Sequence, residues 1–309
     1  MVKRVKLQSD NSATHVLLLG FGYTAQALLP SLFERGYVIS ATVRDQSLIG
    51  AMKDIGVKPL YFKDKFSTEI KESLENTQIL LSSIPPKGGQ DPFLKCIEGD
   101  FKALAPNLKW AGYLSATSVY GDRKGQWVFE NELLRPSTKR GRDRIEAELA
   151  WLETAWPVHI FRLAGLYGPN FKPIGARPIS RNPFQKIKEG RARSIIKEGH
   201  VVNRIHIDDV VSALLSSLDN PNPTQVYNIA DGNPAPPQDV LNYAADLLGV
   251  DRPVQTTVDD PELSDMARSF YAETKRVNIE HAKRELNWEP QFQTYLQGLN
   301  NILQLNHYS

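Results

Sequence analysis

Several features are scarce in this sequence, and each scarcity excludes a class of protein. Cys96 is the one cysteine among 309 residues, so no disulfide can form within the chain, and we expect a reducing, cytoplasmic setting. We interpret Cys96 as a small buried or half-buried side chain rather than as a nucleophile. No apolar run approaches the length of a membrane span.

Charge imbalance and metal-ligand patterns are equally sparse. The 37 lysines and arginines barely exceed the 35 aspartates and glutamates, so bulk electrostatics predict neither a nucleic-acid nor a membrane partner. The 6 histidines show no spacing that is typical of metal ligands. We therefore expect no resident metal, and the length allows one large or two modest domains.

What the sequence does contain is a repeated alternation of apolar runs and helical patterns. Strand-like runs cover 16–19, 37–43, 58–62, 78–83, 110–116 and 158–163, and helix-compatible spacing covers 23–35, 46–55, 67–76, 92–105 and 138–155. We expect Pro30 to kink or end the first helix, and Ile145, Leu149 and Leu152 to share one face of the last. Such alternation predicts an α/β fold, a Rossmann-type doubly wound parallel sheet.

The regular alternation of strand-like and helical segments ends after Pro169. Prolines and glycines crowd 169–183, and only short helical or strand-like segments follow. We predict a Rossmann domain over 14–170, to which about 201–226 returns, and a smaller, discontinuous α/β substrate lobe over 171–309. The lobe would cover the carboxyl edge of the sheet, where ligands of open α/β sheets bind.

One short motif indicates a ligand. The apolar run that ends at Leu19 leads into Gly20-Phe21-Gly22-Tyr23-Thr24-Ala25, which fits the pattern G-x-G-x-x-G/A. In such a turn the first glycine permits a tight bend and the second lets the backbone approach a pyrophosphate. The free N–H groups of the following helix would face the phosphates. The motif therefore predicts a dinucleotide site.

Five ordered segments resemble the extended short-chain dehydrogenase/reductase superfamily, of the NAD-dependent epimerase/dehydratase type. They are SATSVYGD at 115–122, FRLAGLYGP at 161–169, IHIDDV at 205–210, YNIA at 227–230 and LNWEP at 286–290. The resemblance implies an NAD(P)-binding epimerase/dehydratase-like or reductase-like protein that acts on a small anionic or nucleotide-sugar-like substrate. It leaves a homodimer open.

The resemblance also implies the residues around the cofactor. Arg44 stands where the family reads the adenosine ribose, and an arginine there pairs with the 2′-phosphate of NADP. Asp45 follows and would favour NAD, unless it caps the next turn before Ser47. We expect NADP, with NAD as the alternative. The other expected cofactor-binding residues are Gly20, Gly22, Tyr23, Thr24, Asp64 and Ser82.

The sequence departs from the family mainly at the positions of the family's catalytic residues. The family's Ser/Thr falls at Ala116, its Tyr at Arg140 and its Lys at Arg144. This pattern resembles an atypical branch. Arginine stays protonated in proteins, so this pair would suit recognition of a substrate anion rather than proton transfer. A solvated basic helix face is the alternative interpretation.

Other residues would then have to move protons. The catalytic candidates are Ser115, Thr117, Tyr120 and Tyr167. We expect His206 to be structural and Asp208 or Asp209 to cap a helix.

Basic residues gather in the segment that lines the substrate cleft of the family. They are Lys172, Arg177, Arg181, Lys186, Lys188, Arg191, Arg193 and Lys197, against one acid, Glu189. We expect an anionic substrate, although a solvated surface is the alternative. A non-catalytic NADP-binding redox sensor or scaffold remains the second hypothesis for the whole chain, because all three family catalytic residues are replaced.

Overall fold

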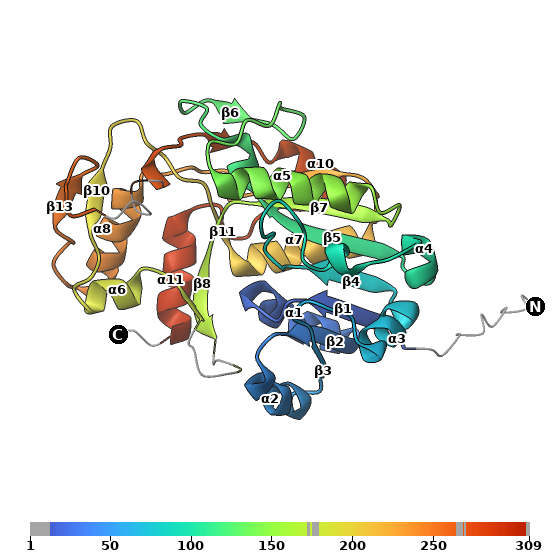
Figure 1. Ribbon diagram of the computed structural model, residues 1–309. Coiled ribbons are helices and arrows are strands. Elements are labelled where there is room, and N and C mark those ends of the chain that lie inside the picture. Colours follow the sequence, from blue (N-terminus) through green and yellow to red (C-terminus); the bar gives the residue numbers. More distant parts are fainter. Residues whose placement is uncertain (1–12, 172–173, 175–178, 264–267, 269, 307–309) are drawn as a thin grey trace, which may run out of the picture.

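The computed structural model describes residues 13–171, 174, 179–263, 268 and 270–306 (Figure 1). A parallel sheet of seven strands forms its centre, in the order β12-β7-β5-β4-β1-β2-β3. The strands are β1 (His15–Leu19), β2 (Val38–Val43), β3 (Lys58–Tyr61), β4 (Ile79–Ser82), β5 (Trp110–Ala116), β7 (Val158–Leu163) and β12 (Val226–Ile229). The Rossmann-type fold predicted from the apolar runs is confirmed.

Burial on both faces explains why the strands read as unbroken apolar runs. In β1, Val16 and Leu18 pack into the core on one face of the sheet, and Leu17 and Leu19 pack into the core on the other. A parallel sheet covered by helices on both faces has no solvated side that would favour alternation with polar residues. The apolar runs therefore mark the strands to within a residue or two.

Helices cover the two faces in separate groups. One face carries α1 (Tyr23–Glu34), α2 (Ile49–Asp54) and α7 (Ile207–Asp219), and the other carries α3 (Thr68–Asn76), α4 (Phe101–Leu104) and α5 (Lys139–Leu152). Helix α1 runs through Pro30, so the expected early end is wrong. Pro30 is exposed, and water can satisfy the carbonyl that its missing N–H leaves unpaired.

Two helix predictions need further correction. The segment 92–105 forms only the 3-10 helix Leu94–Cys96 and the short α4. Helix α5 buries Ala147, Glu148 and Trp151, whereas Leu149 is 51% exposed. The apolar pattern misses this face because the buried Glu148 is compensated by an ion pair from another element.

A smaller lobe stands beside the carboxyl edge of the sheet, at the left of Figure 1. It contains β8 (Gly165–Phe171), β9 (Ile179–Arg181), β10 (Ser194–Ile196), β11 (Arg204–His206) and β13 (Gln255–Thr257), with α6 (Phe184–Lys188), α8 (Pro237–Leu248) and α11 (Tyr295–Asn306). Tyr167, Phe184 and Leu299 are buried in its core. At the top of Figure 1, above α5, β6 (Trp127–Val128) pairs with β14 (Arg276–Val277), and α10 (Glu280–Leu286) follows.

Candidate functional site

The strand order reverses between β1 and β4, and this switch point positions the glycine turn. Leu19 at the end of β1 pairs with Ser82 at the end of β4. The helix that follows β1 lies on one face of the sheet, and α3, which precedes β4, lies on the other. Ligands of doubly wound sheets bind in the crevice that such a reversal opens.

Gly20 occupies a position that only glycine fits. Its φ is +89°, a region that side chains with a Cβ rarely adopt. A Cβ built there would lie 2.9 Å from Ser83 Oγ, and the Gly20 N–H donates to Thr42 Oγ1 at 2.7 Å. The turn is therefore held tightly between β2 and the end of β4.

Gly22, in contrast to Gly20, occupies a position where the protein has room for a side chain. Its φ of −91° suits any residue, and a Cβ there would meet no atom of the described residues within 4 Å. Gly22 is the N-cap of α1, whose first turn has no side-chain cap and no acid. The protein itself does not require a glycine here, whereas a pyrophosphate against the helix N-terminus would. The turn fits a dinucleotide.

The next two residues are packed into the protein. Thr24 is buried, and the Tyr23 hydroxyl donates to the Pro169 carbonyl at 2.7 Å. Burial raises the pKa of Tyr23 far above its usual value. The Arg181 guanidinium lies over the Tyr23 ring, 5.7 Å from its centre. The Tyr23 side chain therefore connects the turn to the lobe.

The expected adenosine end lies at the tips of β2 and β3. Arg44 is exposed directly after β2, and Asp64 is exposed after β3. Asp45 accepts hydrogen bonds from Ser47 N at 3.0 Å and Ser47 Oγ at 2.7 Å, as the capping interpretation requires. Ser82 is fully buried, and its Oγ has no partner among the described residues. Cys96 is half-buried, and its thiol contacts the Asp64 carbonyl.

Two catalytic candidates lie inside a buried hydrogen-bond network. Ser115 Oγ donates to Glu148 Oε1, and Glu148 accepts from Arg162 Nη2 at 2.8 Å. Arg162 Nη1 donates to the Tyr120 hydroxyl at 2.9 Å, which itself donates to Asn228 Oδ1 at 2.7 Å. All five side chains are buried. This network joins β5, α5, β7 and β12, and sequence reasoning missed Glu148 and Arg162. An arginine within the apolar run of β7 was the available signal.

The other two candidates are placed differently. Thr117 is half-buried in the 3-10 helix Thr117–Tyr120, and its side chain makes no hydrogen bond within the described part of the chain. Tyr167 is buried in the lobe, and its hydroxyl has no hydrogen-bond partner among the described residues. Burial, with Asp231 and Asp209 nearby, raises the pKa of Tyr167 far above its usual value.

Arg140 and Arg144 do not form a symmetric clamp. Arg144 Nη1 donates to the Leu114 carbonyl at 2.6 Å and lies 3.3 Å from the Tyr113 hydroxyl, so its side chain turns inward onto β5. Arg140 is exposed and forms no ion pair or hydrogen bond within the described ranges. Its neighbour Lys139 pairs instead with Asp143, at 2.8 Å.

The junction between β11 and α7 corrects the expected cap. His206 Nδ1 accepts from the Asp208 N–H at 3.3 Å, so the histidine caps the helix. Asp209 is buried and accepts from the backbone N–H groups of Gln291 and Phe292. Asp209 cannot cap α7 because its carboxylate is occupied by the segment that precedes α11.

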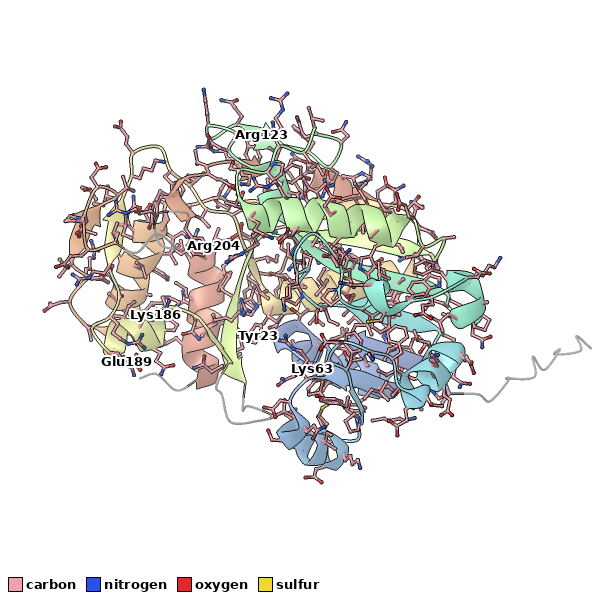
Figure 2. All side chains as sticks on the ribbon, in the orientation of Figure 1. Tyr23, Lys63, Arg123, Lys186, Glu189 and Arg204 are labelled. Carbon is pink, nitrogen blue, oxygen red and sulfur yellow. The ribbon has the colours of Figure 1, made fainter. Side chains whose placement is uncertain are left out.

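A cavity of about 370 Å³ opens in the lobe. Arg181, Lys186 and Arg204 line it together with Tyr167 and Tyr295, and no acid is among the described lining residues. We call it the basic cavity. Figure 2 shows Lys186 and Arg204 on different elements of the lobe, with Tyr23 at the start of α1. Arg204 Nη1 is held by the carbonyls of Val202 and Ala235.

The remaining basic residues of this segment lie elsewhere. Lys188, Arg191, Arg193 and Lys197 do not line the cavity, and Lys172 and Arg177 lie outside the described residues. No group of three or more metal-ligating side chains gathers within the described ranges. In the same part of the chain, no helix has both the length and the apolar character to cross a membrane.

Comparison with known proteins places this geometry in a family. No family model matches the chain. The solved structure of a conserved protein of unknown function from Silicibacter pomeroyi DSS is 38% identical and superposes with a TM-score of 0.86, over 95% of this chain and 99% of that one. The chain belongs to the same family as this protein. Protein YeeZ of Escherichia coli strain K12 is 28% identical over 250 residues, 77% of this chain and 85% of YeeZ.

More distant structures define the fold of this family. The dTDP-glucose 4,6-dehydratase of Bacillus anthracis str. Ames, solved in complex with NAD, is 18% identical and has a TM-score of 0.73, over 94% of this chain and 96% of that one. The resemblance to the extended short-chain dehydrogenases/reductases is thus confirmed at the level of the fold.

Proposed function

We propose that the chain is an NADP-dependent enzyme of the epimerase/dehydratase or reductase type, acting on a small anionic substrate. One observation carries the proposal. The turn at the switch point needs glycine at Gly20 for its own packing, but at Gly22 it leaves space that none of the described residues fills. A phosphate group explains a glycine at the second position, since the fold does not.

Arg44 favours NADP over NAD. The adjacent acid, Asp45, caps the turn that follows, because its Oδ1 accepts from the Ser47 N–H and hydroxyl. An exposed guanidinium can form a charge-assisted pair with a 2′-phosphate. The backbone of the Gly20–Ala25 turn would hold the pyrophosphate, and Asp64 would face the adenine. The cofactor would supply or accept a hydride.

The basic cavity is the proposed site for the anionic part of the substrate. Three cations and no acid line it among the described residues, and Leu166, Val240 and Leu241 provide apolar walls. Such a combination suits a phosphate or carboxylate attached to a small organic skeleton. The contact between Arg181 and Tyr23 joins this cavity to the glycine turn.

Two of the four hydroxyl groups considered for proton transfer remain as candidates. Ser115 and Tyr120 are occupied by Glu148, Arg162 and Asn228, which leaves Thr117 and Tyr167. The raised pKa of Tyr167 keeps its hydroxyl protonated, so it can donate a hydrogen bond to a substrate oxygen but cannot act as a base at neutral pH. We infer that Thr117 and Tyr167 polarise and orient the substrate.

A non-catalytic NADP sensor or scaffold is the second candidate. The occupied hydroxyls of Ser115 and Tyr120, with Ala116, Arg140 and Arg144 at the family's catalytic positions, favour it. The two hypotheses share the cofactor site and differ in turnover.

Turnover with matched substrates separates the two hypotheses. NADPH oxidation is followed with phosphorylated and unphosphorylated aldoses of the same carbon skeleton. The enzyme proposal predicts turnover with the phosphorylated compounds, and Lys186→Ala should raise KM with little change in kcat. Arg191→Ala is the matched control, because Arg191 pairs with Glu189 outside the cavity. Tight NADPH binding without turnover across the panel would favour the sensor.

A further inference from the structure

Arg204 differs from the other two cations that line the basic cavity, because its side chain is half-buried and held in place. Its Nη1 donates to the carbonyls of Val202, at 2.9 Å, and Ala235, at 3.0 Å. Arg181 and Lys186 are exposed, so water and salt screen their charges more strongly. The charge of Arg204 should therefore contribute most to the binding of an anion in this cavity.

Asp231 is the acid that lies beside Arg204, and it does not line the basic cavity. It follows β12, and its backbone N–H donates to the Arg204 carbonyl at 2.7 Å. Its side chain is only 4% exposed, and its Oδ1 accepts from the Asn233 N–H at 3.0 Å. A buried acid is thus placed next to the fixed cation of the cavity.

Burial sets the charge of Asp231 near neutral pH. It raises the pKa of the carboxyl to about 7, against the opposing effects of the Asn233 N–H and the Arg204 guanidinium. Asp209, a second buried acid nearby, adds to the rise. Asp231 therefore gains its negative charge as the pH rises through neutrality, in surroundings where water screens that charge poorly.

The other titratable groups that face Arg204 among the described residues keep their charge between about pH 5.5 and pH 8. Burial lowers the pKa of His200 to about 4, so its ring stays neutral. Burial raises the pKa of three hydroxyls near Arg204, which therefore stay protonated: those of Tyr167, Tyr271 and Tyr295. Arginine itself stays protonated in proteins. After burial, Asp231 has the largest effect on the pKa of Arg204.

Two further sets of charges lie near Asp231. Burial raises the pKa of Asp209 to about 6, and two backbone N–H groups already hold its carboxylate. On the other side of Asp231, an ion-paired group lines a separate hollow: Lys283 with Glu280 and Glu289. None of these residues lines the basic cavity, so Asp231 is the titrating acid that is best placed to act on Arg204.

We propose that Asp231 sets the anion affinity of the basic cavity through Arg204, as a positioning residue that does not touch the substrate. Ionised Asp231 offsets the charge of Arg204 and repels an incoming anion. Protonated Asp231 leaves the full charge of Arg204 facing the cavity. The affinity for an anion of constant charge should therefore rise as the pH falls. The inference rests on the proposed function, because it takes the basic cavity as the anion site.

Isothermal titration of the full chain with glucose 6-sulfate, at pH 5.5 and pH 8 and constant ionic strength, tests the proposal. The sulfate ester keeps one negative charge over this range, whereas a phosphate ester would itself titrate. We expect wild-type affinity to be roughly 10-fold higher at pH 5.5, the effect of one poorly screened charge at short range. Asp231→Asn should bind at pH 8 about as tightly as the wild type does at pH 5.5, with a pH dependence below about 2-fold.

Asp246→Asn is the matched control, because it removes the same charge from an exposed carboxylate of α8 that does not line the cavity. Its pH dependence should equal that of the wild type. A measurement on the wild type alone guards against misfolding of Asp231→Asn. Titrations at pH 7 in buffers of different ionisation enthalpy should show net uptake of protons when glucose 6-sulfate binds.

The proposal is overturned if wild-type affinity does not change with pH, or if no protons are taken up at pH 7. It is also overturned if Asp231→Asn keeps the wild-type pH dependence, or if Asp246→Asn loses it. Each of these results leaves the basic cavity standing as an anion site. Absence of glucose 6-sulfate binding at both pH values is a different outcome, because the proposed substrate site and this inference would then fail together.

Discussion

Glu148 and Arg162 form an ion pair of 2.8 Å in which both side chains are buried. The pair connects α5 to β7 and also orients Ser115 and Tyr120 through their hydroxyls. Ser115 and Tyr120, which the sequence motifs suggest for catalysis, therefore belong to a buried hydrogen-bond network that stabilises the sheet. The pair thereby stabilises the end of β5 and the turn that follows it.

Replacing Glu148 with Gln should destabilise the protein. The substitution leaves the Arg162 guanidinium buried without a counter-charge, which typically costs about 3 kcal/mol. Urea unfolding measures the loss. Glu146→Gln, on the exposed face of the same helix, should change the free energy of unfolding by less than about 0.5 kcal/mol. Equal losses in the two variants would show that the buried pair contributes nothing particular.

The two arginines of α5 should respond differently to truncation. Arg144→Ala removes the donor to the Leu114 carbonyl and should cost about 1–2 kcal/mol of stability. Arg140→Ala should leave the free energy of unfolding unchanged within about 0.5 kcal/mol, because this exposed side chain forms no ion pair or hydrogen bond within the described ranges. Urea unfolding of both variants measures the difference, and equal losses would contradict the inward placement of Arg144.

Arg44→Ala should reduce the affinity for NADP and spare that for NAD. The reason is the loss of a charge-assisted contact with the 2′-phosphate, which only NADP carries. Calorimetry with both cofactors measures the change, and Lys58→Ala at the start of β3 serves as the control. The prediction fails if wild-type protein binds NAD as tightly as NADP, or if both affinities fall together.

Asp231→Asn should change how stability depends on pH. Burial raises the folded-state pKa of Asp231 to about 7, well above the ordinary value for an aspartate of about 4. The folded protein therefore holds this proton more tightly than the unfolded chain, and the group costs stability as pH rises through that interval. Relative to wild type, the variant should gain roughly 3 kcal/mol between pH 5 and pH 8. A difference in unfolding free energy that does not change with pH would contradict the raised pKa.

The sequence predicted the sheet well because its strands are buried on both faces. The runs 110–116 and 158–163 match β5 and β7 residue for residue, and the glycine motif lies at the switch point between β1 and β4. Both signals are local: an apolar run and a short turn are written in consecutive residues. The resemblance of five ordered segments added the correct superfamily fold.

The parts that the sequence did not predict depend on contacts between distant segments. Glu148 reads as a solvated residue of a basic helix until Arg162 is placed beside it. Lys186, Arg204 and Tyr295 come from three separate elements to line one cavity. The segment 92–105 carried a helical pattern, but tertiary packing leaves only short turns there. Long-range pairing of this kind leaves no periodic trace in the chain.

Binding of NADP to Gly22→Val tests the central claim most directly. Within the described part of the chain, a Cβ at Gly22 meets no atom within 4 Å, so the variant should fold as the wild type does, with a loss of at most about 1 kcal/mol at the helix cap. The side chain would occupy the space of the pyrophosphate. Gly50→Val, at another open and exposed glycine in α2, is the control. Calorimetry should detect NADP binding to the wild type and the control and none to Gly22→Val, whereas equal affinity in all three proteins would contradict the dinucleotide site.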